Sequence, residues 1–178
     1  MYTPAENLPD IIRFYRDELA DQSGRLLSEI LSERHEWLEF THDYIQWLFP
    51  LAEASAFNPE APVLTPAAIA EFRANPALGE RLQQAFELML SFYGLQQEPK
   101  PSGEFRVTRS ADFEQRARNW LTPGNHNHLR ITRILKSLGL LGLRPQADAF
   151  LACLLEISRD HPRIINTNTL SFWRTAVR

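Results

Sequence analysis

The chain has 178 residues, of which 44% are hydrophobic and 23% are charged, a balance that excludes a disordered polypeptide and fits one folded domain. Its single cysteine, Cys153, excludes a disulfide framework and a cysteine-rich zinc site. No apolar run approaches the ~20 residues that a membrane span needs. The first residues carry no basic and apolar leader pattern, so we expect a cytoplasmic protein without an integral membrane span.

Acidic and basic residues are distributed unevenly along the chain. Residues 1–64 contain 12 acidic residues and 4 arginines, whereas residues 65–178 contain 10 acidic and 15 basic residues. No acidic residue occurs between Glu114 and Asp148, although this stretch contains six basic residues and two histidines. Such asymmetry is typical of a site for an anion or a nucleic acid. Acidic and basic segments that face each other within the fold would produce the same pattern.

Apolar residues recur with helical spacing in the first third of the chain. The spacing predicts helices over residues 10–20, 26–31 and 41–49. Residues 41–49 present a wide apolar arc, which favours burial of that helix, including Trp47. Residues 50–65 contain three prolines and no helical period, so a long loop is expected there. The polar face left on the third helix consists of His42, Asp43 and Gln46.

Two cap signals begin the middle part of the chain. Thr65-Pro66 and Asn75-Pro76 each place a capping side chain before a proline, which predicts helices from 66 to 73 and from 76 to 93. Gly94 is suited to the left-handed conformation that ends a helix. Residues 95–110 contain two prolines and a glycine, so we expect a loop there, with a short strand at Phe105 and Val107 left open.

Four further helices are expected in the last third of the chain. The first follows Ser110, and the second begins at about residue 125 or 127 and ends near residue 138. The third begins at Pro145, and the fourth carries Leu170 and Trp173. No secure strand and no repeat of fixed period is present. The pattern therefore predicts an all-α protein, a single compact irregular bundle of about eight helices over residues 1–178.

His42-Asp43 is the first motif that could carry chemistry. An imidazole and a carboxylate suit divalent metals, and helical metal-dependent phosphohydrolases use such a dipeptide. Those sites also need an upstream histidine and a distant aspartate, and His35 is the only histidine that precedes His42. A polar helix face or a cap near Thr41 is the alternative interpretation. We expect no bound metal and no cofactor.

His126 and His128 form a second candidate pair. Imidazoles two residues apart chelate zinc from a strand or a loop, but on a helix they point about 200° apart. Since a helix is expected to begin here, a capping asparagine followed by histidines at the helix start is the structural alternative. A metal-dependent hydrolase that uses His42, Asp43, His126 and His128 stays open as an alternative function.

The helix that begins near residue 125 supplies the leading ligand site. His126, Arg130, Arg133 and Ser137 fall within about 60° of arc on its wheel. Two neighbouring guanidiniums bind a carboxylate or a phosphate well, so we expect a small anion or a peptide to bind here. His42, Asp43 and Gln46 are further candidate contacts. An internal ion-pair network with an acidic residue from elsewhere in the chain would use the same arginines.

Nucleic-acid binding is a third possible function. The basic segment 116–144 contains a helix, a glycine-containing connection and a second helix, which is similar in outline to a helix-turn-helix. The net charge of −3 argues against it. The residues that would contact the nucleic acid are Arg130, Arg133, Lys136 and Arg144. The sequence does not decide the oligomeric state.

Several longer motifs resemble one known family. The segments are Trp37-Leu38-Glu39, residues 41–50 and 57–62, residues 89–95 and 125–135, and Phe172-Trp173. Together they resemble the conserved region of opioid growth factor receptors. The resemblance implies a receptor-like, peptide-binding protein, because vertebrate members are described as receptors for the enkephalin-type opioid growth factor, associated with the nuclear periphery or membranes. It supplies no catalytic residues, so we expect a non-catalytic ligand- or peptide-binding module.

Overall fold

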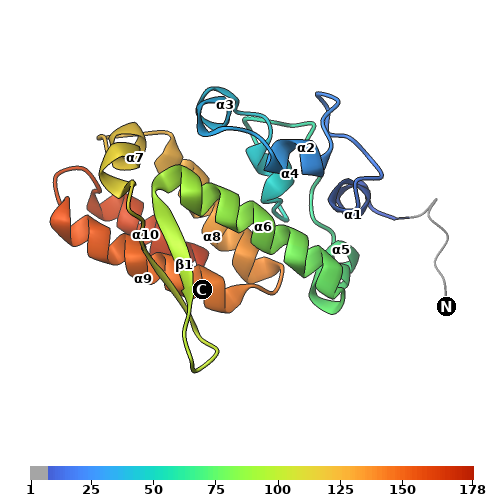
Figure 1. Cartoon of the computed structure of the whole chain (residues 1–178). Helices are drawn as coiled ribbons and strands as arrows, with labels where there is room; N and C mark the ends of the chain where they lie inside the picture. The colour runs from blue at the N-terminus through green and yellow to red at the C-terminus, as the bar shows by residue number, and fades with distance from the viewer. Residues whose placement is uncertain (1–7) are drawn as a thin grey trace. The chain divides into compact units, whose positions relative to one another are not determined.

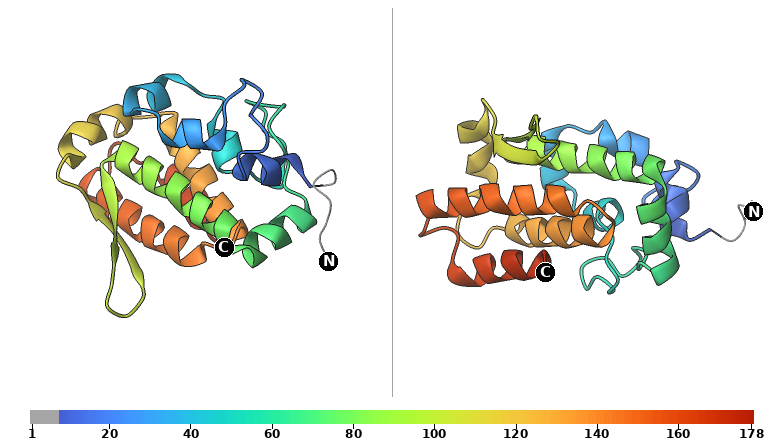
Figure 2. Two further views of the ribbon diagram at one scale, coloured as in Figure 1. Left: turned by 45° about the vertical axis from the view of Figure 1, so that its right-hand side comes forward. Right: turned by 90° about the horizontal axis from the view of Figure 1, so that it is seen from below.

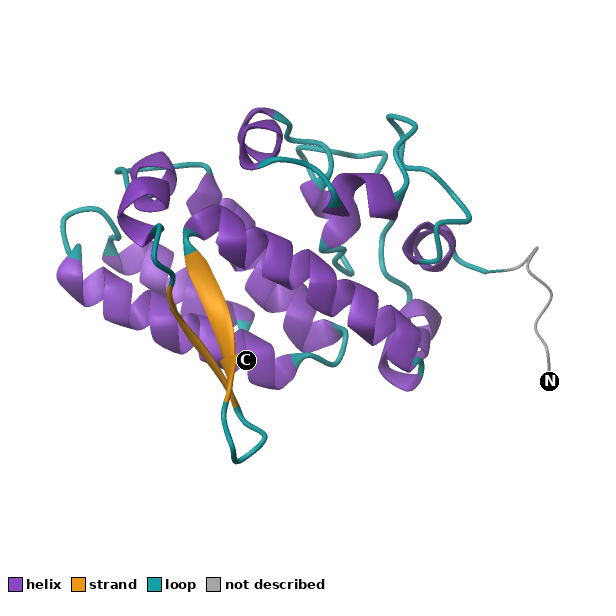
Figure 3. Ribbon diagram, viewed as in Figure 1, coloured by secondary structure: helices purple, strands orange, loops and turns teal. Residues whose placement is uncertain are grey.

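The computed structural model describes residues 8–178, which form ten helices and one two-stranded sheet (Figure 3). The chain is therefore mostly helical, as the sequence predicts. It divides into two compact units, the first ending at Ala85 and the second beginning at Phe86. Helix α6 (Pro76–Tyr93) runs across this division. A single domain over residues 1–178 stays a prediction, and each unit is described here by itself.

The first unit contains short helices joined by long connections. Thr65 caps α5 as predicted, because its hydroxyl accepts a hydrogen bond of 3.1 Å from the backbone N–H of Ala68. Asn75 caps α6 in the same way, through a 3.1 Å bond from the N–H of Ala77. The helices before α6 are α1 (Asp10–Tyr15), α2 (Leu27–Leu31), α3 (His35–Phe40), α4 (Ile45–Leu48) and α5 (Pro66–Ala74).

Aromatic rings form the centre of the first unit. The ring centroids of Phe14 and Trp47 are 5.0 Å apart, and those of Tyr15 and Phe72 are 4.8 Å apart. The buried hydroxyl of Tyr15 donates a hydrogen bond to the carbonyl oxygen of Leu48. Burial of Trp47 agrees with the wide apolar arc that the sequence displays. These contacts join α1, α4 and α5 into one core.

The prediction of a helix over residues 41–49 is wrong in its extent. Only Ile45–Leu48 are helical, and Thr41 has an extended backbone with φ of −97° and ψ of 134°. The preceding residues form α3, a helix that the sequence analysis did not predict. The carboxylate of Asp43 accepts hydrogen bonds from Ser23 and Arg25, which precede α2. His42, Asp43 and Gln46 thus do not share one helix face.

The second unit packs long helices side by side. Helix α8 contacts both α9 and α10, and the right view of Figure 2 shows these three helices next to one another. The rings of Tyr93 and Trp120 lie 5.4 Å apart, and Phe86 and Phe150 lie 5.5 Å apart. The helices after α6 are α7 (Phe113–Trp120), α8 (Asn127–Leu140), α9 (Arg144–Asp160) and α10 (Thr167–Ala176).

The loop expected over residues 95–110 is a β-hairpin. Strand β1 (Leu95–Pro99) pairs antiparallel with β2 (Phe105–Arg109), and Gln97 lies opposite Val107 (Figure 1). Proline is tolerated in edge strands, and both strands of this two-stranded sheet are edge strands; Pro99 is the last residue of β1. The turn closes through a 2.8 Å bond from the N–H of Lys100 to the carbonyl of Glu104. Pro101 lies in the turn and Pro99 at the end of β1, so neither proline prevents pairing.

Gly94 ends α6 as predicted. Its φ is +75°, and a Cβ atom there would lie 2.8 Å from the Cα of Phe113 and from the Cβ of Arg116. Its carbonyl oxygen accepts a 2.9 Å bond from the N–H of Ser110. The residue thus combines a left-handed turn with close approach of α7, and both need the absence of a side chain.

No helix within residues 8–178 is both long enough and apolar enough to cross a bilayer. Helix α6 has 18 residues, and glutamate, arginine and glutamine side chains interrupt its apolar ones. The cytoplasmic location expected from the composition stays a prediction.

Candidate functional site

Asp43 joins two segments of the first unit. Its carboxylate accepts a 2.9 Å hydrogen bond from the guanidinium of Arg25 and a 2.6 Å bond from the hydroxyl of Ser23. Its backbone carbonyl accepts bonds from the side chains of Gln22, at 3.3 Å, and Asn58, at 3.0 Å. The side chain and the backbone of one residue therefore fix the loop before α2 and the loop after α4.

Charge partners account for the ionisation of Asp43. Burial alone would raise its pKa, but the hydrogen bonds from Ser23 and Arg25 and the charge of Arg25 lower the pKa below its ordinary value of 3.8. Arg25 also lies 2.5 Å from the buried carboxylate of Asp21 and 5.2 Å from the ring centroid of Trp37. The charge at Asp43 thus has a structural use.

The hydrolase alternative receives no support from this geometry. His42 is exposed, whereas the Asp43 carboxylate is turned to Arg25 and Ser23. Within residues 8–178, no three histidine, cysteine, aspartate or glutamate side chains come together in a way that could hold a metal ion. The neighbouring candidate Gln46 is only 5% exposed, and its Oε1 has no hydrogen-bond partner among these residues.

His128 is a core residue of the second unit. Its Nε2 lies 3.0 Å from the carbonyl oxygen of Trp120, so Nε2 carries the proton and donates. Its ring meets the rings of Trp120 and Trp173 edge to face, and the indole of Trp173 donates a 3.1 Å bond to the His128 carbonyl. Burial lowers the pKa of His128 below 6.5. These contacts agree with the structural alternative for His128, in which the histidine stabilises the fold.

The expected polar stripe on α8 is only partly at the surface. Arg130 is 6% exposed and Ser137 is 0% exposed, whereas His126 is exposed and Arg133 is half-buried. The guanidinium of Arg130 lies 3.4 Å from the side-chain oxygen of Asn127, one turn earlier. Burial removes two of the four residues from an open groove. A site at His126 and Arg133 stays a prediction.

The basic segment 116–144 carries partly neutralised charge. Arg116 pairs with Asp112 at 3.3 Å, and Arg144 pairs with Asp148 at 2.9 Å. With Arg130 buried, fewer cations remain for the phosphates that dominate binding of a nucleic acid. This geometry does not favour the nucleic-acid alternative.

An open hollow of about 460 Å³ lies between β2 and α9. Three arginines reach it from two elements, Arg106 and Arg109 from β2 and Arg159 from α9. We call this hollow the arginine pocket. Its lining consists of Arg106, Thr108, Arg109, Cys153, Glu156, Arg159 and Asp160.

The arginine pocket retains positive charge. Arg109 pairs with Asp160, and its guanidinium lies 4.8 Å from the ring centroid of Phe113. Among residues 8–178, neither Arg106 nor Arg159 has an acidic side chain within ion-pair distance. Both side chains are exposed. Three arginines face two carboxylates, Glu156 and Asp160, so one positive charge is left in excess in this hollow.

Cys153 lies at the inner wall of the arginine pocket and is 4% exposed. Burial raises the pKa of its thiol to about 12, helped by the nearby charge of Glu156 and opposed by Arg109 and Arg106. A thiol with such a pKa carries almost no thiolate at neutral pH, so it is a poor nucleophile. The pocket can hold an anion but has no activated nucleophile at this position.

The sequence did not predict the arginine pocket, because a loop was expected over residues 95–110 and a short strand at Phe105 and Val107 was only left open. A usable signal was present, since Phe105-Arg106-Val107-Thr108-Arg109 alternates apolar and polar residues as a strand does. Arg159 gave no signal of its own, because it lies beside Asp160 in a segment of mixed charge. Only the packing of β2 against α9 brings it to Arg106.

The chain matches known proteins along nearly its whole length. The model of the conserved region of the opioid growth factor receptor matches residues 6–178. The opioid growth factor receptor of Mus musculus is 39% identical over 173 residues, which cover 94% of this chain and 27% of that relative. The receptor of Homo sapiens is 36% identical over 190 residues, with coverages of 97% and 27%. Opioid growth factor receptor-like protein 1 of Mus musculus is 38% identical over 135 residues, with coverages of 74% and 28%.

These matches place this chain in only one part of longer relatives. It spans little more than a quarter of the length of the curated proteins named above. No solved structure matches it significantly. The matched range contains every segment that carried the resemblance, from Trp37 to Trp173. The chain therefore belongs to the family defined by the conserved region of the opioid growth factor receptor.

Proposed function

We propose that this chain is a non-catalytic module that binds a peptide or a small anionic ligand. The observation that carries the proposal is the arginine pocket, an open hollow in which Arg106 and Arg159 are exposed and form no ion pair among residues 8–178, and in which three arginines outnumber the two carboxylates of Glu156 and Asp160. A guanidinium binds a carboxylate through two parallel hydrogen bonds, which provides both affinity and orientation. The relatives are named as receptors of a growth factor, and that name supports a peptide as the ligand.

The pocket has the features of a binding site more than those of a catalytic site. Its thiol has a raised pKa, and its two carboxylates, Glu156 and Asp160, are exposed. The receptor role that the names of the longer relatives give is a further proposal for this chain, because it spans only part of their length.

Titration of a fluorescent enkephalin-type peptide with the full chain tests the proposal. We expect saturable binding, seen as a rise in anisotropy, that weakens with salt because charges of opposite sign attract. The double change Arg106→Gln and Arg159→Gln should weaken binding by about tenfold or more, since hydrogen bonds to charged groups contribute about 1.5–3 kcal/mol each.

Arg118→Gln is the matched control. Arg118 is an exposed arginine on α7 that does not line the pocket, so the variant should bind as the unchanged chain does. Absence of saturable binding would contradict a receptor-like function for this peptide. Equal loss in both variants would contradict the pocket as the site.

A further inference from the structure

A second hollow lies on the other side of α9 in the second unit. It has a volume of about 310 Å³, and α9, α10 and the loop between them form its walls. Apolar side chains, Leu155, Ile165 and Leu170 among them, supply much of the lining. No acidic side chain belongs to it. We call it the α9–α10 groove, and its lining consists of Leu155, Ser158, Arg159, Pro162, Ile165, Thr167, Leu170 and Arg174.

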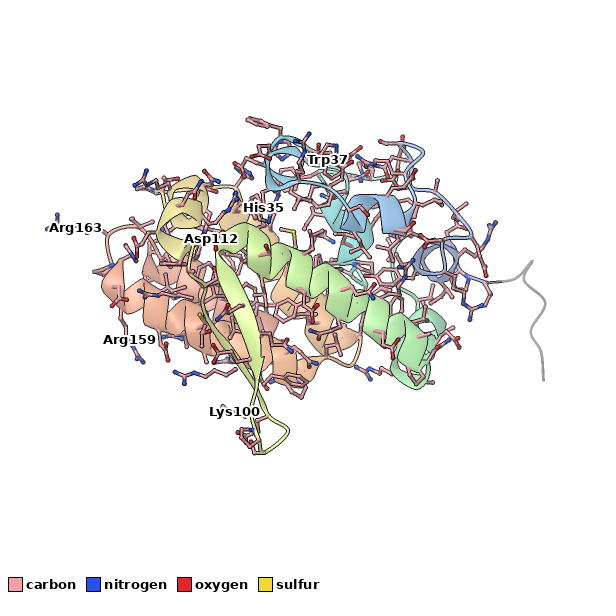
Figure 4. All side chains as sticks on the ribbon, in the orientation of Figure 1. His35, Trp37, Lys100, Asp112, Arg159 and Arg163 are labelled. Carbon is pink, nitrogen blue, oxygen red and sulfur yellow. The ribbon has the colours of Figure 1, made fainter. Side chains whose placement is uncertain are left out.

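Arg159 lines both hollows. Successive residues of an α-helix are rotated by about 100°, so Cys153, Glu156 and Asp160 share the side of α9 that borders β2. Leu155 and Ser158 lie on the side that borders α10. Arg159 falls between the two sides and projects outward from α9 in Figure 4. One guanidinium thus stands at the boundary between a charged hollow and an apolar one.

The charges around this boundary favour an anion. Four arginines line the two hollows, against two acidic residues, and Asp160 already pairs with Arg109. Arg174 is exposed and lies on the groove side. An anion held at Arg159 would therefore have further positive charge on both sides.

We propose that the arginine pocket and the α9–α10 groove together recognise the carboxyl-terminal residue of a peptide. The free carboxylate pairs with Arg159 and Arg106, and the last side chain, an apolar one, enters the groove. The inference rests on the proposed function and names the part of the peptide that is recognised. Its basis is that a terminal carboxylate and the last side chain leave the same Cα atom in different directions. Two adjacent hollows that share one arginine match that arrangement.

An apolar ligand without a carboxylate would leave the guanidiniums without a partner. A free phosphate would leave the groove empty. Recognition of a carboxyl terminus uses both hollows at once, which is why we favour it. Glu156 lines the arginine pocket and should repel peptides that carry acidic side chains next to their last residue.

Pools of fluorescein-labelled pentapeptides test this inference with the full chain. Each pool has random residues at all positions except the last, which is Leu, Lys or Asp, and each is made with a free carboxyl and with an amidated end. We expect the Leu pool with the free carboxyl to bind best. Amidation should weaken that binding about tenfold or more, because it removes the charged acceptor of the guanidinium hydrogen bonds.

Single arginine changes locate the site. Arg159→Gln should reduce the difference between the acid and amide pools, because only Arg106 then remains to pair with the carboxylate, and Arg174→Gln should reduce affinity for the acid pool. Arg163→Gln is the control, because this exposed arginine follows α9 but lines neither hollow (Figure 4). All three residues are exposed, so the variants should fold, which a thermal melt of each verifies.

The outcomes separate this inference from the broader proposal. Equal binding of the acid and amide pools would overturn carboxyl-terminal recognition and leave peptide binding intact. Failure of every pool to bind would overturn it too, and the enkephalin-type titration would then decide the broader function by itself. Preference for Lys or Asp over Leu at the last position would overturn the assignment of the groove.

Discussion

The carboxylate of Asp43 lies 2.9 Å from the guanidinium of Arg25. The sequence offered Asp43 and its neighbour His42 as a possible metal-binding dipeptide. In the structure the Asp43 carboxylate is instead engaged by Arg25 and by the hydroxyl of Ser23. Two loops that are distant in sequence depend on the same aspartate, since its carbonyl also accepts a bond from Asn58. A residue type that suits catalysis here stabilises the fold.

Asp43→Ala should lower the free energy of unfolding by about 1 kcal/mol. The expected loss of stability is small because the side chain is 38% exposed, and water screens an ion pair at such a position. Urea denaturation measures the change. Asp10→Ala is the control, because Asp10 is 66% exposed and lies 3.7 Å from Arg13, so its loss should matter by less than about 0.5 kcal/mol. A larger effect at Asp10 than at Asp43 would contradict this account.

The contribution of Asp43 should depend on pH in acid. Its pKa is lower in the folded chain than the ordinary 3.8, so the unfolded state binds more protons between the two values. Its stabilising effect is therefore present above pH 3.8 and disappears as the pH falls through the folded pKa. The stability difference between the unchanged chain and Asp43→Asn should shrink over that range. A difference that stays constant would be inconsistent with the lowered pKa.

Acidification should destabilise the second unit through His128. Burial and the charge of His126 favour the neutral ring, so the folded pKa lies below 6.5 despite the hydrogen bond to Trp120. Stability is fully present above pH 6.5 and is lost as the pH falls through the folded pKa, because the unfolded state binds the proton more readily. An imidazole titration followed by nuclear magnetic resonance should place the pKa of His128 below the ordinary 6.5. A value above 6.5 would refute the prediction.

Cys153 should resist alkylation in the folded chain. A pKa of about 12 instead of the ordinary 9.0 reduces the thiolate fraction at neutral pH by about a thousandfold, and burial adds a steric barrier. Mass spectrometry after treatment with iodoacetamide at pH 7.5 should find little labelling until urea unfolds the chain. Rapid labelling without urea would mean that the thiol is open to solvent.

Gln46→Met should leave the free energy of unfolding unchanged or raise it by up to about 1 kcal/mol, because it removes an unsatisfied buried oxygen and retains most of the volume. Gln146→Met is the matched control, since Gln146 is buried as well but has an interaction partner. The control should therefore be destabilised. If Gln46→Met is the less stable of the two, the amide of Gln46 makes a bond that the structure lacks.

Local patterns in the sequence determined the long helices. Thr65-Pro66 and Asn75-Pro76 cap α5 and α6, and Gly94 ends α6, because each signal acts on the backbone within a few residues. The apolar arc that predicted burial of Trp47 also held, although its helix proved shorter. Helical class is determined by such short-range interactions, so it could be predicted.

Tertiary structure decided the hairpin, the environment of Asp43 and the arginine pocket. Residues 95–99 become a strand only because 105–109 lie beside them, and Arg106 meets Arg159 only because β2 packs against α9. The wheel of α8 placed Arg130 and Ser137 on an open stripe, yet both are buried, because one helix considered alone does not reveal which neighbours cover it. Strand pairing, ion pairs and the burial of a particular helix face depend on contacts between residues far apart in sequence, and local periodicity alone does not identify the partners.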